Sequence, residues 1–160
     1  GKPLEKAVID ALKLLDFKAE GFNDGELELD QIIIDPNGNR LIGECEGKDN
    51  CAIDIDKFRQ LVDSLNEDWS KNGSTDRATG LLFGNPERLK KIEERTVDFT
   101  DKCKRGAERE KVGLILTKDL FKIVQYLKNK NDEKFKEDCR KAIFDNLGKI
   151  IEFPKIPKEE

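Results

Sequence analysis

The chain has 160 residues, enough for one hydrophobic core and short for two domains of ordinary size. Hydrophobic residues make up 36% of it, charged residues 40%, and the net charge is −4, which favours a soluble globular protein over a disordered or membrane-spanning one. Histidine is absent, which excludes His-based catalytic triads, His metal ligands and His proton shuttles. The N-terminus carries no recognisable secretory signal, so we expect a cytoplasmic protein.

Charged residues are unevenly distributed along the chain, and the cysteines are scattered. The first 56 residues carry 14 acidic and 6 basic side chains, whereas the remainder carries a basic excess. The four cysteines form no Cys-x-x-Cys pair, and we expect buried free thiols at Cys45, Cys51, Cys103 and Cys139.

Apolar residues recur every three or four positions in some segments, which indicates helices, and alternate or cluster in others, which indicates strands. Helix 55–69, for example, has its apolar residues at Ile55, Phe58, Val62, Leu65 and Trp69, and Asp54 can cap it. In chain order we predict helix 4–15, strands 17–20, 27–34 and 41–46, helix 55–69, strand 78–83, helix 99–110, strand 112–116, a helix from 117, helix 132–146 and strand 149–153.

This alternation of helices and strands predicts an α/β fold, a three-layer α/β/α sandwich with a mixed central sheet. We expect one domain over residues 1–153 and a loose tail over 154–160. The residues Asp-Pro-Asn-Gly-Asn at 35–39 predict a hairpin turn between strands 27–34 and 41–46.

Acidic side chains gather on this hairpin. Side chains two apart on a strand share a face, so Glu28 lies with Asp30, and Glu44 lies with Glu46 and, if the strand continues, Lys48. Asp30 and Glu44 lie at similar distances from the turn and can approach one cation. Two carboxylates with a backbone carbonyl and water suffice for Mg²⁺ or Mn²⁺. The alternatives are a solvated surface for the strand carboxylates and a surface ion pair between Glu46 and Lys48.

The order of the first helix (LEKAVIDALKLLDF), the acidic strand (ELELDQIII), GECEGK and a helix beginning IDKFRQL resembles the PD-(D/E)xK nuclease superfamily. The similarity in element order covers residues 4–116, and its motifs lie within 28–61. It implies a restriction-endonuclease-like fold and metal-dependent hydrolysis of nucleic-acid phosphodiesters, DNA in particular.

The resemblance also implies roles for individual residues. Asp30 matches the first acidic residue and Glu44 the glutamate of the E-x-K motif, so both are expected to bind the metal. Glu46 stands where the motif has lysine, and Lys48 is two residues further along; both are candidates for the catalytic group. Two outer candidates complete the expected site, Glu5 on the first helix and Arg59 on the helix after the motif.

The hypothesis is therefore a Mg²⁺- or Mn²⁺-dependent nuclease that binds nucleic acid and no membrane. Because Glu46 replaces the motif lysine, the alternative is an inactive scaffold of the same fold that binds nucleic acid or a protein partner, or a helper domain of a longer chain. The oligomeric state stays open, with a homodimer among the alternatives. Basic side chains that could contact phosphates are Arg88, Lys90, Lys91, Arg95, Lys102, Lys104, Arg105 and Arg109.

Overall fold

A five-stranded sheet forms the middle layer of the molecule in the computed structural model, which describes residues 1–73 and 77–158. In spatial order its strands are β1 (Lys18–Asn23), β2 (Glu28–Ile34), β3 (Arg40–Gly47), β4 (Thr79–Asn85) and β5 (Gly113–Leu116). The pairs β1–β2 and β2–β3 are antiparallel, whereas β3–β4 and β4–β5 are parallel. The sheet is therefore mixed, as predicted.

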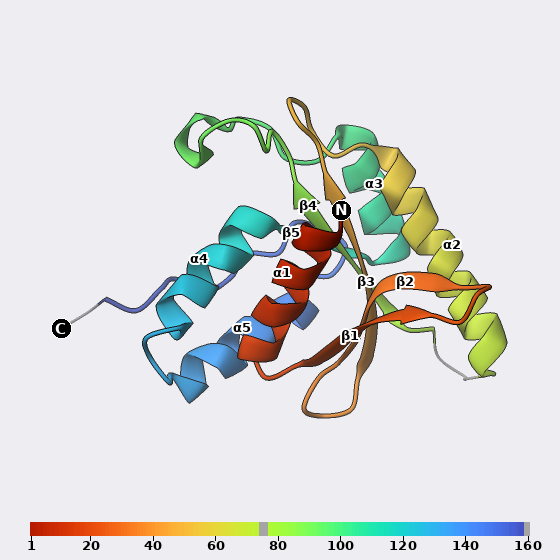
Figure 1. Cartoon of the computed structure of the whole chain (residues 1–160), viewed down its shortest axis with the longest axis horizontal. Helices are drawn as coiled ribbons and strands as arrows, with labels where there is room; N and C mark the ends of the chain where they lie inside the picture. The colour runs from red at the N-terminus through yellow and green to blue at the C-terminus, as the bar shows by residue number, and fades with distance from the viewer. Residues whose placement is uncertain (74–76, 159–160) are drawn as a thin grey trace.

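Helices cover both faces of this sheet (Figure 1). One face carries α1 (Lys2–Leu14), α4 (Thr117–Leu127) and α5 (Glu133–Asp145), and the other carries α2 (Ile55–Asn72) and α3 (Asp101–Glu110). A short 3₁₀ helix, η1 (Ile92–Glu94), lies in the long connection between β4 and α3. This three-layer arrangement confirms the α/β/α prediction.

The sheet separates two apolar clusters, and alternate residues of β3 enter one or the other. Leu41 and Cys45 pack in the cluster beneath α1, α4 and α5, whereas Ile42 packs in the cluster beneath α2 and α3. Because side chains alternate along a strand, Glu44 points toward the α2 layer. The same alternation in β2 puts Ile33 on the α1 side and Asp30 on the α2 side.

The predicted hairpin turn is confirmed, and Asp35 organises it. The Asp35 carboxylate accepts hydrogen bonds from the backbone N–H groups of Asn37 (3.0 Å) and Asn39 (2.7 Å) and from the Asn39 side chain (2.8 Å). Gly38 has φ +88°, a conformation that L side chains rarely adopt. This turn fixes the register of β2 against β3.

The buried face of α2 differs from the prediction. Its buried residues are Phe58, Leu61, Ser64, Leu65 and Asp68, whereas Trp69 is 44% exposed. Relative to the predicted stripe the helix is rotated by roughly 80° on a 100°-per-residue wheel. The apolar pattern was misleading because two polar residues, Ser64 and Asp68, belong to the buried face.

Two further expectations are corrected. The predicted strand 149–153 does not form: Ile150 makes one isolated bridge to Leu114, so the segment runs beside β5 for a single step. Cys51 is exposed rather than buried, although all four thiols are free as expected. Beyond residue 153, Ile156 packs against the core, and residues 159–160 of the expected tail lie outside the described part.

None of the helices within residues 1–73 and 77–158 combines the length and apolar character that crossing a bilayer requires.

Candidate functional site

Asp30 and Glu44 face each other across the β2–β3 hairpin. The last paired residues at this end are Gln31 and Gly43, so Asp30 and Glu44 are the next two residues in register. One Asp30 oxygen, Oδ2, accepts a hydrogen bond of 2.9 Å from the backbone N–H of Cys45. The Asp30 carboxylate thereby ties β2 to the next residue of β3 and lies beside Glu44.

A lysine from the neighbouring layer reaches both carboxylates. The Lys57 ammonium on the first turn of α2 lies 3.6 Å from Glu44 Oε2 and 3.9 Å from Asp30 Oδ2. Asp54 fixes where this helix begins, because its carboxylate caps the N-terminus by accepting from Asp56 N at 3.0 Å. The site therefore combines side chains from β2, β3 and α2.

Glu44 is the most unusual ionisable group in this cluster. It is 1% exposed, and neither of its side-chain oxygens has a hydrogen-bond partner in the described part of the chain. Burial and, to a smaller extent, the adjacent Asp30 raise the pKa of the Glu44 carboxyl to about 8, against the opposing effect of the positive charge of Lys57.

The unsatisfied oxygens fit a divalent cation. A buried acceptor without a partner is costly, and hard oxygen donors from two adjacent carboxylates suit Mg²⁺ or Mn²⁺. Within residues 1–73 and 77–158 there is no group of three or more His, Cys, Asp or Glu side chains placed to hold a metal. A cation bound here would therefore take its remaining ligands from water and backbone carbonyls.

Lys48 forms its ion pair with Asp54 rather than with Asp30 or Glu44. Its ammonium is 3.2 Å from Asp54 Oδ2, and this hydrogen bond is the main reason that the pKa of Lys48 is raised. Strand β3 ends at Gly47, so the alternation that would turn Lys48 toward the site ends there as well. Glu46 is half-buried, and its charge acts on Lys48 rather than on Glu44.

The two outer candidates, Glu5 and Arg59, lie on helices that cover opposite faces of the sheet. Glu5 is half-buried on α1, which covers the opposite face of the sheet, and its charge acts on the Cys45 thiol. Burial raises the pKa of that thiol to about 12, so Cys45 is an inert core residue. Arg59 is exposed on α2.

Lys57 is the residue that reading the sequence missed. It lies four residues before Leu61 and eight before Leu65, so it belongs to the true buried face of α2. A stripe drawn through Leu61, Leu65 and Asp68 would have included it. The apolar pattern chosen instead placed Lys57 outside the face that meets the sheet.

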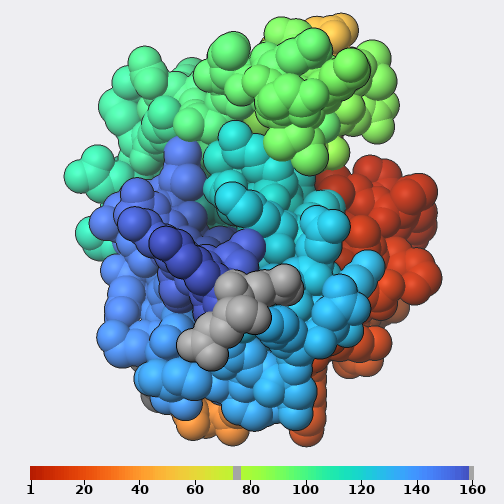
Figure 2. All heavy atoms as spheres, turned by 90° about the vertical axis from the view of Figure 1, so that its left-hand side faces the viewer, coloured from red at the N-terminus to blue at the C-terminus, as the bar shows by residue number. Residues whose placement is uncertain are grey.

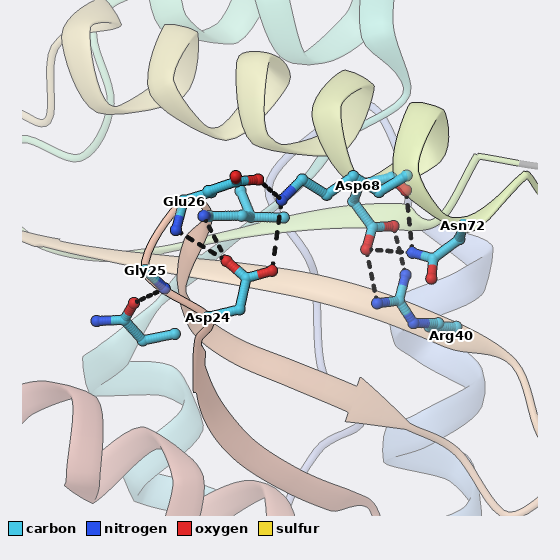
Figure 3. A network of polar contacts seen from close by, with 9 residues as sticks. Asp24, Gly25, Glu26, Arg40, Asp68 and Asn72 are labelled. Atoms are coloured by element: carbon cyan, nitrogen blue, oxygen red, sulfur yellow. Dashed lines mark hydrogen bonds and ion pairs between the residues drawn. The ribbon is translucent and has the colours of Figure 1, made fainter.

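A second polar cluster holds the other end of α2 against the hairpin (Figure 3). The Arg40 guanidinium on β3 makes a two-pronged ion pair with the Asp68 carboxylate, with 2.7 Å between Nη2 and Oδ1. Asn72 donates to the same carboxylate at 2.8 Å. Further along, Lys71 pairs with Glu26 at 2.9 Å. These contacts fix the helix that carries Lys57.

Several basic residues expected to contact phosphates already have acidic partners. Lys104 lies 3.1 Å from Asp98, and Arg88 pairs with Asp49. Lys90 pairs with Glu87, a buried carboxylate that also accepts from the backbone N–H groups of Thr96 and Val97. These pairs weaken the basic surface of the connection between β4 and α3.

Comparison with family models gives no match, and neither does comparison with curated proteins. Among solved structures, the chain is similar to a repair endonuclease from Pyrococcus abyssi, with a TM-score of 0.39 and 15% sequence identity. The similarity covers 60% of this chain and 43% of that chain.

Proposed function

We propose that the chain is a divalent-metal-dependent nuclease whose cation binds between Asp30 and Glu44. The observation that carries this proposal is the buried Glu44 carboxylate, which lies beside Asp30 and has neither oxygen hydrogen-bonded within the residues that the structure describes. A carboxylate that only faces solvent would not be buried, and a buried carboxylate with a purely structural role would have hydrogen-bonding partners.

Three side chains have distinct roles in the proposed reaction. When bound, Mg²⁺ or Mn²⁺ polarises a phosphoryl oxygen and lowers the pKa of a coordinated water. Asp30 and Glu44 hold the cation, and the Asp30 hydrogen bond to Cys45 N fixes the orientation of one ligand. Lys57 supplies a positive charge for the negative charge that develops on the phosphate, taking the role that the sequence assigned to Lys48.

The substrate class rests on the chemistry of this site and on the sequence resemblance. A carboxylate pair with a lysine close by is suited to hydrolysis of an anionic ester, and the hairpin motif points to nucleic-acid phosphodiesters, DNA in particular. A chain without histidine needs another way to generate a nucleophile, and a cation held by Asp30 and Glu44 would supply it by lowering the pKa of water.

The test is a cleavage assay with single-stranded, duplex and branched DNA in Mg²⁺ or Mn²⁺. We expect metal-dependent products from the wild type and a rate at least about 100-fold lower from Glu44→Gln. Glu28→Gln is the matched control, because Glu28 is an exposed carboxylate on β2. If Glu44→Gln cleaves as fast as Glu28→Gln, the proposed assignment is wrong.

A second candidate is a scaffold of the same fold that binds nucleic acid or a protein without cleaving. It is favoured by one observation: Lys57 already lies within 4 Å of both carboxylates and partly neutralises them. In that case the cluster is a buried ion network, and no DNA structure yields a metal-dependent product. This second function is identified if the wild type binds DNA without cleaving it and Glu44→Gln binds DNA as well.

A further inference from the structure

A hollow of about 370 Å³ lies between the connection after β4 and the start of α4. Figure 2 shows this face of the molecule, with the green segment that follows β4 above the cyan helix α4. Its lining includes three cationic side chains, one hydroxyl and two apolar side chains, with two amides beside them: Arg95, Lys118, Lys122, Thr117, Ile92, Phe121, Asn85 and Gln125. This volume is within the range of small-molecule sites.

Arg95 is held in place by neutral acceptors. Its guanidinium donates to Asn85 Oδ1 at 2.9 Å, to the Lys90 carbonyl at 3.1 Å and to the Arg88 carbonyl at 3.3 Å. None of these partners carries a charge. The orientation of Arg95 is therefore fixed, and among residues 1–73 and 77–158 no carboxylate forms an ion pair with it.

The segment that carries Arg95 is itself fixed by Glu87. The Glu87 carboxylate accepts from Thr96 N at 2.7 Å and from Val97 N at 2.9 Å, directly after Arg95. The ion pair with Lys90 and these two hydrogen bonds lower the pKa of Glu87 to about 2. One wall of the hollow is thus built from ordered backbone.

Lys118 and Lys122 form the opposite wall, one turn apart on α4. Among residues 1–73 and 77–158, neither has a carboxylate within ion-pair distance. Asp119 is the acidic side chain that acts on both, and burial raises the pKa of its carboxyl. The residues that line the hollow therefore include three cations, and Asp119 lies outside this lining.

Thr117 contributes a hydroxyl to the lining of the hollow. The residue is 1% exposed. It is the first residue of α4, whose N-terminus has no side-chain cap, so the backbone N–H groups of this turn are available as well. Uncapped N–H groups at a helix start favour anions.

We propose that this hollow binds the phosphate group of a nucleotide. Arg95, Lys118 and Lys122 bind the phosphate oxygens, the Thr117 hydroxyl donates to one of them, and Ile92 and Phe121 contact the sugar or base. The proposal is independent of the metal site, because the hollow opens on the α4 layer whereas Asp30 and Glu44 face α2. The phosphate belongs either to a free nucleotide or to the end of a strand.

Titration of the ¹⁵N-labelled protein with inorganic phosphate, thymidine 5′-monophosphate and thymidine, without divalent metal, tests the proposal. We expect thymidine 5′-monophosphate to bind at least about 10-fold tighter than thymidine and to shift the amide resonance of Thr117. The double variant Lys118→Ala/Lys122→Ala should bind it at least about 10-fold more weakly. Equal affinity for the nucleotide and the nucleoside overturns the proposal.

A matched control and two oligonucleotides complete the experiment. Lys134→Ala/Lys141→Ala removes two exposed lysines from α5 and should leave binding unchanged, and equal loss in both double variants overturns the pocket assignment. Glu44→Gln should retain phosphate binding even if it abolishes cleavage, which separates this proposal from the proposed nuclease activity. Tighter binding of a 5′-phosphorylated oligonucleotide than of the unphosphorylated one assigns the phosphate to a strand end, whereas preference for the mononucleotide assigns it to a free nucleotide.

Discussion

At the scale of single residues, the carboxyl group of Glu44 opposes folding of the metal-free protein as the pH rises. Its pKa is about 8 in the folded chain against an ordinary value of 4.5. The unfolded chain therefore loses its proton first, and stability that is fully present below pH 4.5 is lost progressively up to about pH 8. An uncharged glutamine at this position has no proton to lose.

We therefore predict that Glu44→Gln is more stable than the wild type at pH 9 and that this advantage shrinks toward pH 5. Urea unfolding in a chelator at both pH values measures the difference. The exposed Glu28→Gln variant should follow the wild type at both. If the wild type and Glu44→Gln lose the same stability between pH 5 and pH 9, the pKa of Glu44 is not raised by folding.

Lys57 has a different expected phenotype, because it competes with the cation for the same carboxylates. Lys57→Met keeps most of the side-chain volume and removes the charge, so we expect Mg²⁺ affinity to be retained or increased while cleavage falls about 10- to 100-fold. Calorimetric titration with Mg²⁺ and the cleavage rate separate the two effects. Loss of Mg²⁺ binding together with cleavage would mean that Lys57 only maintains the shape of the site.

At the scale of elements, the Arg40–Asp68 pair fastens the end of α2 to β3. Asp68 is 4% exposed and also accepts from Asn72, so removing its carboxylate leaves several donors without an acceptor. Because Arg40 stays partly hydrated, we expect Asp68→Ala to lower the free energy of unfolding by about 2 kcal/mol.

Asp63→Ala is the control for this prediction, since Asp63 is an exposed carboxylate on the same helix. It should change the free energy of unfolding by less than about 0.5 kcal/mol. Equal effects of the two substitutions in urea unfolding would contradict the role assigned to Asp68.

The sequence predicts the elements well where the pattern is local. The hairpin follows from Asp35 and Gly38, whose turn chemistry requires no distant partner, and its register then brings Asp30 and Glu44 together. Lys57 could not be found in this way, because the buried face of α2 depends on polar partners such as Arg40 that lie far away in sequence. The prediction of strand 149–153 was wrong for a related reason: an apolar segment can pack beside a sheet without forming a ladder of hydrogen bonds.

At the scale of the whole molecule, cation binding and folding are linked. A ligand that binds only the folded state stabilises it, and a concentration ten times its dissociation constant contributes about 1.4 kcal/mol. We predict that Mg²⁺ raises the melting temperature of the wild type at pH 8 and leaves that of the double variant Asp30→Asn/Glu44→Gln unchanged. Calcium-free differential scanning calorimetry at constant ionic strength measures this, and equal shifts in both proteins would indicate unspecific ion effects.

The central claim is that Asp30 and Glu44 bind one divalent cation, and a crystal soaked in Mn²⁺ tests it most directly. We predict one anomalous peak between β2 and β3, within about 2.0 to 2.4 Å of a carboxylate oxygen from each residue, with the Lys57 ammonium displaced from its position near both. The absence of a peak there, with Lys57 still within 4 Å of both carboxylates, would contradict the account.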